Sequence, residues 1–190
     1  RPGPEEHGQG APRPVTLAQL LDRAALRYPE APAVVDGARR LTYADLARQA
    51  AALGRSLADL GIAKGDRVLI ALKNRLEHVL AYWALQRIGG VPTPVNFRLS
   101  ARELRYVLED CGARVSFFEP ATAAGMLEAA EGWPGLLVSV GDEAPAGGIR
   151  FAELLGPGRA PLDRDVNESD LSLILYTSGT TGRPKGVPRT

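Results

Sequence analysis

The segment from Tyr176 to Gly186 has the residue types best suited to chemistry in this 190-residue sequence, and it reads Tyr-Thr-Ser-Gly-Thr-Thr-Gly-Arg-Pro-Lys-Gly. Its glycines let the backbone approach a ligand closely and adopt positive φ angles, so that successive N–H groups can point at one anion. Its hydroxyl side chains donate hydrogen bonds, and Arg183 and Lys185 add positive charge. The segment therefore predicts a polyphosphate site.

Two other phosphate-binding motifs do not fit this segment. P-loop NTPases need glycine directly before the lysine and Ser or Thr after it, whereas Pro184 and Gly186 flank Lys185. No Gly-x-Gly-x-x-Gly follows an expected strand, so a dinucleotide-binding fold has no support. The remaining alternative is a Gly/Thr/Ser-rich surface connection without a chemical role, and the particular order of the residues argues against it.

The elements that must position this segment alternate between strands and helices. The clearest helix begins after the N-cap Thr42 and carries apolar residues at steps of three and four up to Leu60. Residues 68–72 form a continuous apolar run, which is typical of a parallel strand covered on both faces. Residues 91–95 contain two prolines, which favours an edge strand or an extended connection.

The other expected helices lie at about residues 17–28, 76–88, 101–111 and 122–131, and the other expected strands at 33–35, 114–118, 136–140 and 171–176. Between residues 141 and 170, which are rich in Gly, Pro and charge, only residues 151–155 are expected to be ordered. This alternation predicts an α/β fold, a mostly parallel sheet with helices on both faces. The glycine-rich segment would then follow the C-terminal end of the last strand, where ligands bind in open α/β sheets.

Tyr176 to Gly186 resembles the signature loop of the adenylate-forming superfamily, which includes acyl-CoA synthetases, luciferases and peptide-synthetase adenylation domains. Four upstream blocks resemble the start of such enzymes, in the same order: Leu41–Leu46, Gly61–Leu72, Gly89–Leu99 and Glu103–Ala113. The resemblance implies that residues 15–190 are the N-terminal portion of the large AMP-binding domain, cut before its remainder and its C-terminal domain. Residues 1–14 are expected to be a disordered arm, because they hold little apolar surface.

The resemblance implies a reaction in which a carboxylate attacks the α-phosphate of ATP, pyrophosphate leaves, and the thiol of coenzyme A captures the acyl-adenylate. ATP, Mg²⁺ and coenzyme A are therefore the expected cofactors, and a carboxylic acid is the expected substrate. The implied phosphate cradle comprises Thr177, Ser178, Gly179, Thr180, Thr181 and Gly182. Lys185 is expected to bind the nucleotide and to act as the catalytic residue, because the departing pyrophosphate gathers negative charge. No residue is assigned as a metal ligand, since the acidic ligand lies downstream in the family.

The resemblance leaves the acyl acceptor and the acid open. A fatty or aromatic acyl-CoA ligase is the leading hypothesis. The alternatives are an adenylation enzyme that loads a carrier protein and a non-catalytic ATP-binding remnant. The 190-residue piece alone is expected to be inactive, and to associate through an open sheet edge.

The charge balance and the apolar runs of the sequence limit the kinds of partner that the chain is expected to bind. The 23 Lys and Arg residues nearly balance the 22 Asp and Glu residues, so a net charge of +1 makes no electrostatic case for nucleic acid or an anionic membrane. The longest apolar run, Val79–Leu85, is far shorter than the roughly 18 residues of a membrane span. The single cysteine, Cys111, fits a reducing compartment, so a cytoplasmic location is expected, and it is assigned no role.

A few other residues have types that occur in active sites. A lone histidine, His78, on an apolar helix is expected to be a packing or surface residue. Asn96 and Arg98 are expected to form a turn, and Trp83 and Trp133 are expected in the core.

Overall fold

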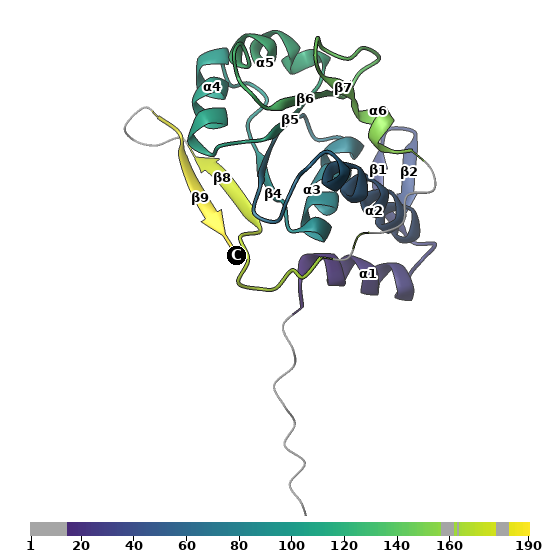
Figure 1. Cartoon of the computed structure of the whole chain (residues 1–190). Coiled ribbons are helices and arrows are strands. Elements are labelled where there is room, and N and C mark those ends of the chain that lie inside the picture. The colour runs from purple at the N-terminus through teal and green to yellow at the C-terminus, as the bar shows by residue number, and fades with distance from the viewer. Residues whose placement is uncertain (1–14, 157–161, 163, 178–182) are drawn as a thin grey trace, which may run out of the picture.

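The computed structural model describes residues 15–156, 162, 164–177 and 183–190. Its centre is a five-stranded parallel sheet with the strand order β4-β3-β5-β6-β7 (Figure 1). The strands are β3 (Arg67–Ala71), β4 (Val91–Pro94), β5 (Val115–Phe118), β6 (Leu136–Ser139) and β7 (Ile149–Arg150). Helices cover both faces of this sheet, which confirms the predicted fold class.

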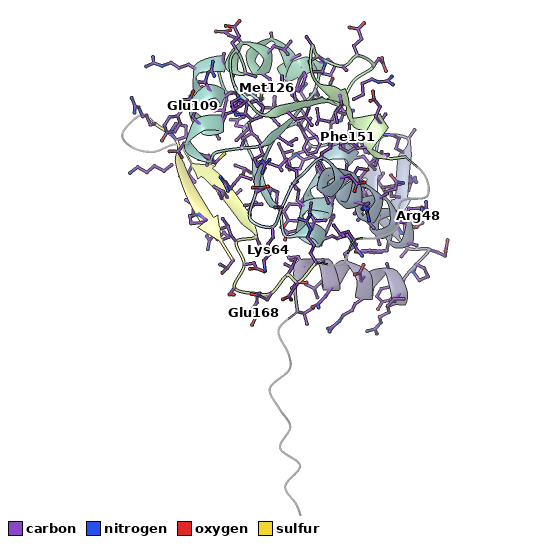
Figure 2. All side chains as sticks on the ribbon, viewed as in Figure 1. Arg48, Lys64, Glu109, Met126, Phe151 and Glu168 are labelled. Carbon is purple, nitrogen blue, oxygen red and sulfur yellow. The ribbon has the colours of Figure 1, made fainter. Side chains whose placement is uncertain are left out.

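One face of the sheet is covered by α1 (Leu17–Arg27), α2 (Tyr43–Asp59), α3 (Leu76–Ile88) and the short α6 (Phe151–Leu154). The other face is covered by α4 (Ala101–Asp110) and α5 (Ala123–Ala129), which follows a 3-10 turn at Pro120–Thr122. Side chains alternate between the two clusters along β3, β5 and β6. In β3, Val68 and Ile70 join the first cluster, whereas Leu69 and Ala71 join the second. Figure 2 labels Phe151 of the first cluster and Met126 of the second.

Local sequence signals set the helix ends as predicted. Thr42 caps α2 by accepting a hydrogen bond from the Asp45 N–H at 3.1 Å, and Ser100 caps α4 in a reciprocal pair with Glu103. The helix α3 ends at Gly89, whose φ of 69° is a left-handed conformation that glycine adopts without strain.

The N-terminal strand β1 (Pro32–Asp36) differs from the prediction because it has a partner. It pairs antiparallel with β2 (Arg39–Thr42), outside the five-stranded sheet. The turn between them contains Gly37 with a φ of 61°, which suits a tight hairpin. The sequence analysis missed β2 because its Arg39-Arg40 start lacks the apolar alternation of a strand.

The strand predicted over residues 171–176 corresponds to β8 (Leu173–Thr177), and its assignment to the parallel sheet was wrong. It pairs antiparallel with β9 (Lys185–Arg189) in a separate two-stranded sheet, with β8 lying beside β4 (Figure 1). The prolines of β4, Pro92 and Pro94, have no N–H to donate, so this edge is poorly suited to another ladder. The glycine-rich segment therefore joins two strands of a hairpin and does not follow a strand of the parallel sheet. The edge position predicted for β4 is confirmed.

Two further predictions concern burial. Trp83 and Trp133 are only partly buried and pack at the borders of the two clusters. Their assignment to the core therefore overestimated how deeply they are buried. Large indole rings are often incompletely buried. Within the described residues, none of the helices has the length and apolar character needed to cross a membrane.

A charged network joins the β1–β2 hairpin, the start of α3 and the end of β5. Glu77, which is 8% exposed, accepts hydrogen bonds from Arg39 and, at 2.6 Å, from Arg75. Arg75 also donates to Glu119 at 2.9 Å, and Asp36 bonds to Arg39. Burial by itself would raise the pKa of Glu77, but the hydrogen bonds from the two arginines outweigh it and lower the pKa to about 2.

Acidification is expected to destabilise the protein through Glu77. Its pKa of about 2 in the folded state lies below the ordinary value of 4.5, so its stabilising contribution is complete above pH 4.5 and is lost as the pH falls towards 2. At about 1.4 kcal/mol per pKa unit, the loss should be about 2 kcal/mol at pH 3 and about 3 to 4 kcal/mol once the carboxyl is fully protonated in the folded state. Urea unfolding of wild type and Glu77→Gln at about pH 5.5 and pH 3 measures it. The variant should lose less stability between the two pH values, and equal losses would contradict the role of Glu77.

Candidate functional site

The described part of the predicted phosphate site consists of the two strand ends that flank residues 178–182. Thr177 ends β8, Lys185 begins β9, and the two residues are paired across the hairpin. Both are exposed, and Lys185 forms no ion pair with any carboxylate of the described residues. The predicted cradle residues Ser178, Gly179, Thr180, Thr181 and Gly182 lie outside the described residues, so their assignment stays a prediction.

Contacts with the domain hold the start of the hairpin. Lys64, in the turn before β3, forms an ion pair with Asp170 at 2.7 Å. Gln86 of α3 donates a hydrogen bond to the carbonyl of Ser172 at 2.7 Å. The Ser172 N–H donates to the carbonyl of Arg189 at 2.8 Å, which continues the pairing of the two strands. Since α3 and β3 belong to the main sheet layer, these contacts fix the hairpin to the domain.

The end of the hairpin nearest residues 178–182 lies against α4. The Tyr176 hydroxyl donates a hydrogen bond to Asp110, and the Tyr106 hydroxyl donates to the other oxygen of the same carboxylate at 3.2 Å. The guanidinium carbon of Arg183 lies 5.9 Å from the centroid of the Tyr106 ring, within the range of a cation–π interaction. Burial, assisted by Asp110, raises the pKa of Tyr176, so its hydroxyl remains protonated.

Gly186 fits this arrangement because it faces Tyr176 across the hairpin. A Cβ atom at this position would lie 3.2 Å from the Tyr176 Cζ atom and 3.3 Å from the Ile174 Cγ2 atom. Such distances are tighter than ordinary van der Waals contact, so a larger residue would push the tyrosine ring. The glycine therefore leaves the space that the ring occupies.

An open cleft of about 780 Å³ separates α4 from the residues that follow the predicted cradle. Its lining is strongly charged and consists of Ser100, Arg102, Glu103, Arg105, Tyr106, Glu109, Arg183 and Pro184. Three of these residues are arginines and two are glutamates, so positive charge is in slight excess beside the candidate site.

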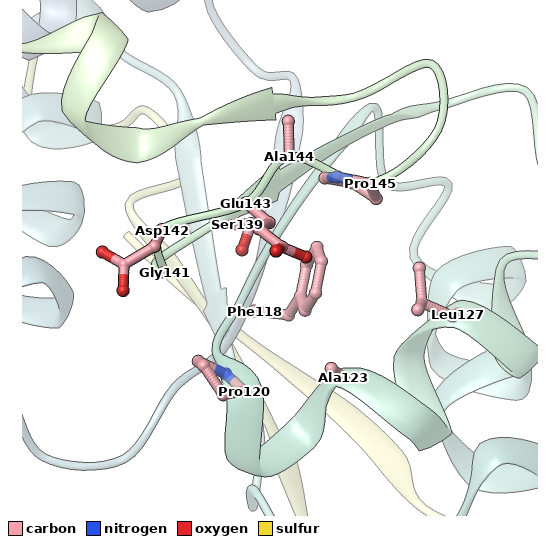
Figure 3. A pocket seen from close by; sticks show the side chains of 10 residues that line it. All are labelled: Phe118, Pro120, Ala123, Leu127, Ser139, Gly141, Asp142, Glu143, Ala144 and Pro145. Atoms are coloured by element: carbon pink, nitrogen blue, oxygen red, sulfur yellow. The ribbon is translucent and has the colours of Figure 1, made fainter.

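A second hollow lies at the carboxyl ends of β5 and β6 and has a volume of about 400 Å³ (Figure 3). Phe118, Pro120 and Leu127 give it apolar walls, while Asp142 and Glu143 stand at its acidic side. Neither Thr177 nor Lys185, the described residues among those predicted to bind phosphate, lines this hollow, and an acidic wall is unsuited to a polyphosphate.

Comparison with known proteins decides the family. The sequence model of the family described as "AMP-binding enzyme" matches residues 21–190. The chain belongs to this family of AMP-binding enzymes. The match includes the described ends of the candidate site, Thr177 and Lys185, and it agrees with the resemblance found in the sequence.

Relatives within the AMP-binding family include several CoA ligases. The chain is 38% identical over 160 residues to the 4-hydroxybenzoate–CoA/benzoate–CoA ligase of Rhodopseudomonas palustris, covering 82% of this chain and 29% of that protein. It is 38% identical over 165 residues to the feruloyl-CoA synthase of an Amycolatopsis species, covering 87% of this chain and 31% of that protein. The chain thus spans about a third of the length of the curated relatives it matches.

A solved structure shares the fold as well. The anthranilate CoA ligase AuaEII, in complex with anthranoyl-AMP, matches with a TM-score of 0.86 and 25% sequence identity. The match covers 94% of this chain and 35% of that chain. The five-stranded sheet and its helices are therefore an arrangement that AMP-binding enzymes share.

Residues outside the hairpin behave largely as the sequence indicated. The Asn96 side chain accepts a hydrogen bond from the Arg98 N–H at 3.0 Å, which confirms the predicted turn. Cys111 is buried, and burial raises the pKa of its thiol to about 11, so the thiolate is scarce at neutral pH. His78 is partly buried on α3, and burial lowers its pKa.

The sequence analysis missed two residues that contact the flanks of the segment Tyr176–Gly186, namely Tyr106 and Asp110. Both lie on α4, about 70 residues before that segment in the sequence. Their spacing of four residues places them on one face of a helix, but nothing in the sequence alone indicates that this face meets the hairpin.

Proposed function

We propose that the chain is the N-terminal part of an ATP-dependent carboxylate–CoA ligase. Such an enzyme joins the carboxylate to the α-phosphate of ATP with loss of pyrophosphate, and then transfers the acyl group to the thiol of coenzyme A with loss of AMP. The observation that carries the proposal is the segment Tyr176–Gly186, flanked by exposed Thr177 and Lys185, in a chain of the AMP-binding family.

The chain's own residues supply positive charge and hydrogen-bond donors. ATP, when bound with Mg²⁺, supplies the electrophilic phosphorus atom and the pyrophosphate leaving group. The Lys185 ammonium, unpaired among the described residues and exposed, can approach the departing pyrophosphate, where negative charge increases in the transition state. The Thr177 hydroxyl, across the hairpin from Lys185, can donate a hydrogen bond to the same group. Ser178, Gly179, Thr180, Thr181 and Gly182 complete the proposed phosphate cradle.

We place the substrate among aromatic carboxylic acids first and fatty acids second. The two relatives at 38% identity are named for benzoate, 4-hydroxybenzoate and feruloyl-CoA, whereas a Mycobacterium tuberculosis relative named for medium- and long-chain fatty acids is 32% identical. A carrier protein as acyl acceptor is the alternative within the family. A cytoplasmic location is part of the proposal, since a single cysteine fits a reducing compartment.

The full-length protein is expected to catalyse carboxylate-dependent exchange between ATP and radiolabelled pyrophosphate. A panel of benzoate, 4-hydroxybenzoate, ferulate and fatty acids of increasing length would identify the substrate, and loss of free CoA thiol would measure the second step. The 190-residue chain alone should show no exchange.

The other outcomes separate the alternatives. Exchange without consumption of CoA would favour transfer to a carrier protein. Tight binding of ATP without carboxylate-dependent release of pyrophosphate would identify a non-catalytic remnant and overturn the proposal.

A further inference from the structure

We infer that Tyr106 and Asp110 on α4 are positioning residues that hold the chain on both sides of residues 178–182 in the register needed to bind ATP. The inference rests on the proposed function and names how that site is supported. Neither residue belongs to the segment Tyr176–Gly186, and both lie on α4, which contacts the flanks of that segment.

The first strand end is held through Tyr176. Its hydroxyl donates to one oxygen of Asp110, and the Tyr106 hydroxyl donates to the other oxygen at 3.2 Å. Each carboxylate oxygen therefore serves one tyrosine. Because Tyr106 and Asp110 are four residues apart on α4, they project side by side from successive turns of the helix.

The chain after residues 178–182 is held through Arg183, two residues before β9 begins. Its guanidinium carbon lies 5.9 Å from the centroid of the Tyr106 ring, so the ring that bonds to Asp110 also attracts the residue that follows the predicted cradle. Two successive turns of α4 thus contact the chain on both sides of residues 178–182.

These contacts determine which way the neighbouring side chains face. Successive residues of a strand point to opposite faces, so Tyr176 held against α4 turns the adjacent Thr177 to the exposed face, together with its partner Lys185. A slip of one residue would turn Thr177 and Lys185 the other way. Gly186, opposite Tyr176, leaves room for the ring and makes the observed register possible.

The charge state of the group supports this role. Burial and the hydrogen bond to Asp110 raise the pKa of Tyr176, and the Tyr106 pKa is raised by the same causes, so both hydroxyls stay protonated donors at neutral pH. Arg183 is the cation that faces Tyr106, and Cys111, the residue after Asp110, is an uncharged thiol.

Kinetics of Tyr176→Phe, Asp110→Ala and the double variant in the full-length protein test the inference. Each single variant is expected to raise the ATP concentration for half-maximal pyrophosphate exchange about 5- to 10-fold, as loss of a hydrogen bond to a charged acceptor would. The double variant should be no worse than Asp110→Ala, because both changes remove the same hydrogen bond. Asp110→Asn keeps an acceptor oxygen and should recover part of the ATP affinity.

The controls separate positioning from general stability. Tyr28→Phe changes an exposed tyrosine at the end of α1 and should leave the kinetics unchanged. A merely structural role would lower the amount of active enzyme, and hence the maximal rate, without changing the ATP concentration at half-maximal rate. Tyr176→Phe removes a single oxygen atom, so the test does not depend on Asp110→Ala folding.

Two results would overturn the inference, and they are distinguishable. An active wild type whose variants keep the wild-type ATP dependence would overturn the inference alone. A wild type without exchange on any acid of the panel would overturn the proposed function and the inference with it.

Discussion

Lys185→Ala in the full-length protein is expected to slow adenylation about 100-fold while weakening ATP binding only a few-fold, because removal of one positioned donor to a transition-state charge has effects of this size. The ammonium meets the extra negative charge mainly in the transition state, so its loss raises the barrier more than it affects the ground state. Lys185 begins β9, is exposed, and pairs across the hairpin with Thr177. Single-turnover release of pyrophosphate and equilibrium binding of ATP measure the two effects separately.

Arg189→Ala is the matched control for this prediction. Arg189 ends the same strand, is exposed, and lies four residues from Lys185, at the opposite end of the hairpin from residues 178–182. Its removal should leave the adenylation rate within about two-fold of wild type, as expected for a cation remote from the phosphates. An unchanged rate in Lys185→Ala would remove Lys185 from the mechanism, and equal losses in both variants would indicate a general charge effect.

Phe117→Ala is expected to destabilise the protein by about 3 to 5 kcal/mol, the usual cost of removing a buried aromatic ring. Phe117 is completely buried in β5, the middle strand of the five-stranded sheet. Its ring meets that of Phe151 at a centroid distance of 5.6 Å and an interplanar angle of 66°, an edge-to-face contact between β5 and α6. The change would leave a cavity that the surrounding strands and helices fill only in part. Urea unfolding of the full-length protein measures the loss.

Leu127→Ala provides the comparison, because Leu127 is 45% exposed on α5. It should change the free energy of unfolding by less than about 0.5 kcal/mol, as most surface substitutions do. Phe117→Leu, which keeps most of the apolar volume, should fall between the two variants. A loss below about 1 kcal/mol in Phe117→Ala would contradict the close packing of this core.

Signals within a few residues of each other predicted the main layers. The Ser100 and Glu103 pair defined the start of α4, and the apolar run of β3 identified a strand covered on both faces. Caps and periodic patterns act through neighbouring residues, so they can be interpreted without knowledge of the fold. The same locality explains why the Tyr176–Gly186 segment could be linked to a family from its sequence.

Strand pairing at the ends of the chain could not be predicted in this way. The polar β2 was missed, and β8 was assigned to the parallel sheet although it pairs with β9. A strand's partner depends on which edge is free and on which donors that edge offers, and these are properties of the assembled sheet.

By itself, the sequence determined the α/β class, most helix ends and the family of the glycine-rich segment, because each is encoded in residues close together in the chain. Only the tertiary structure decided that this segment's flanks form a hairpin, and that Asp110 and Tyr106 lie against them. Asp110 and Tyr176 are 66 residues apart, and their hydrogen bond forms only because the folded sheet brings α4 and β8 together.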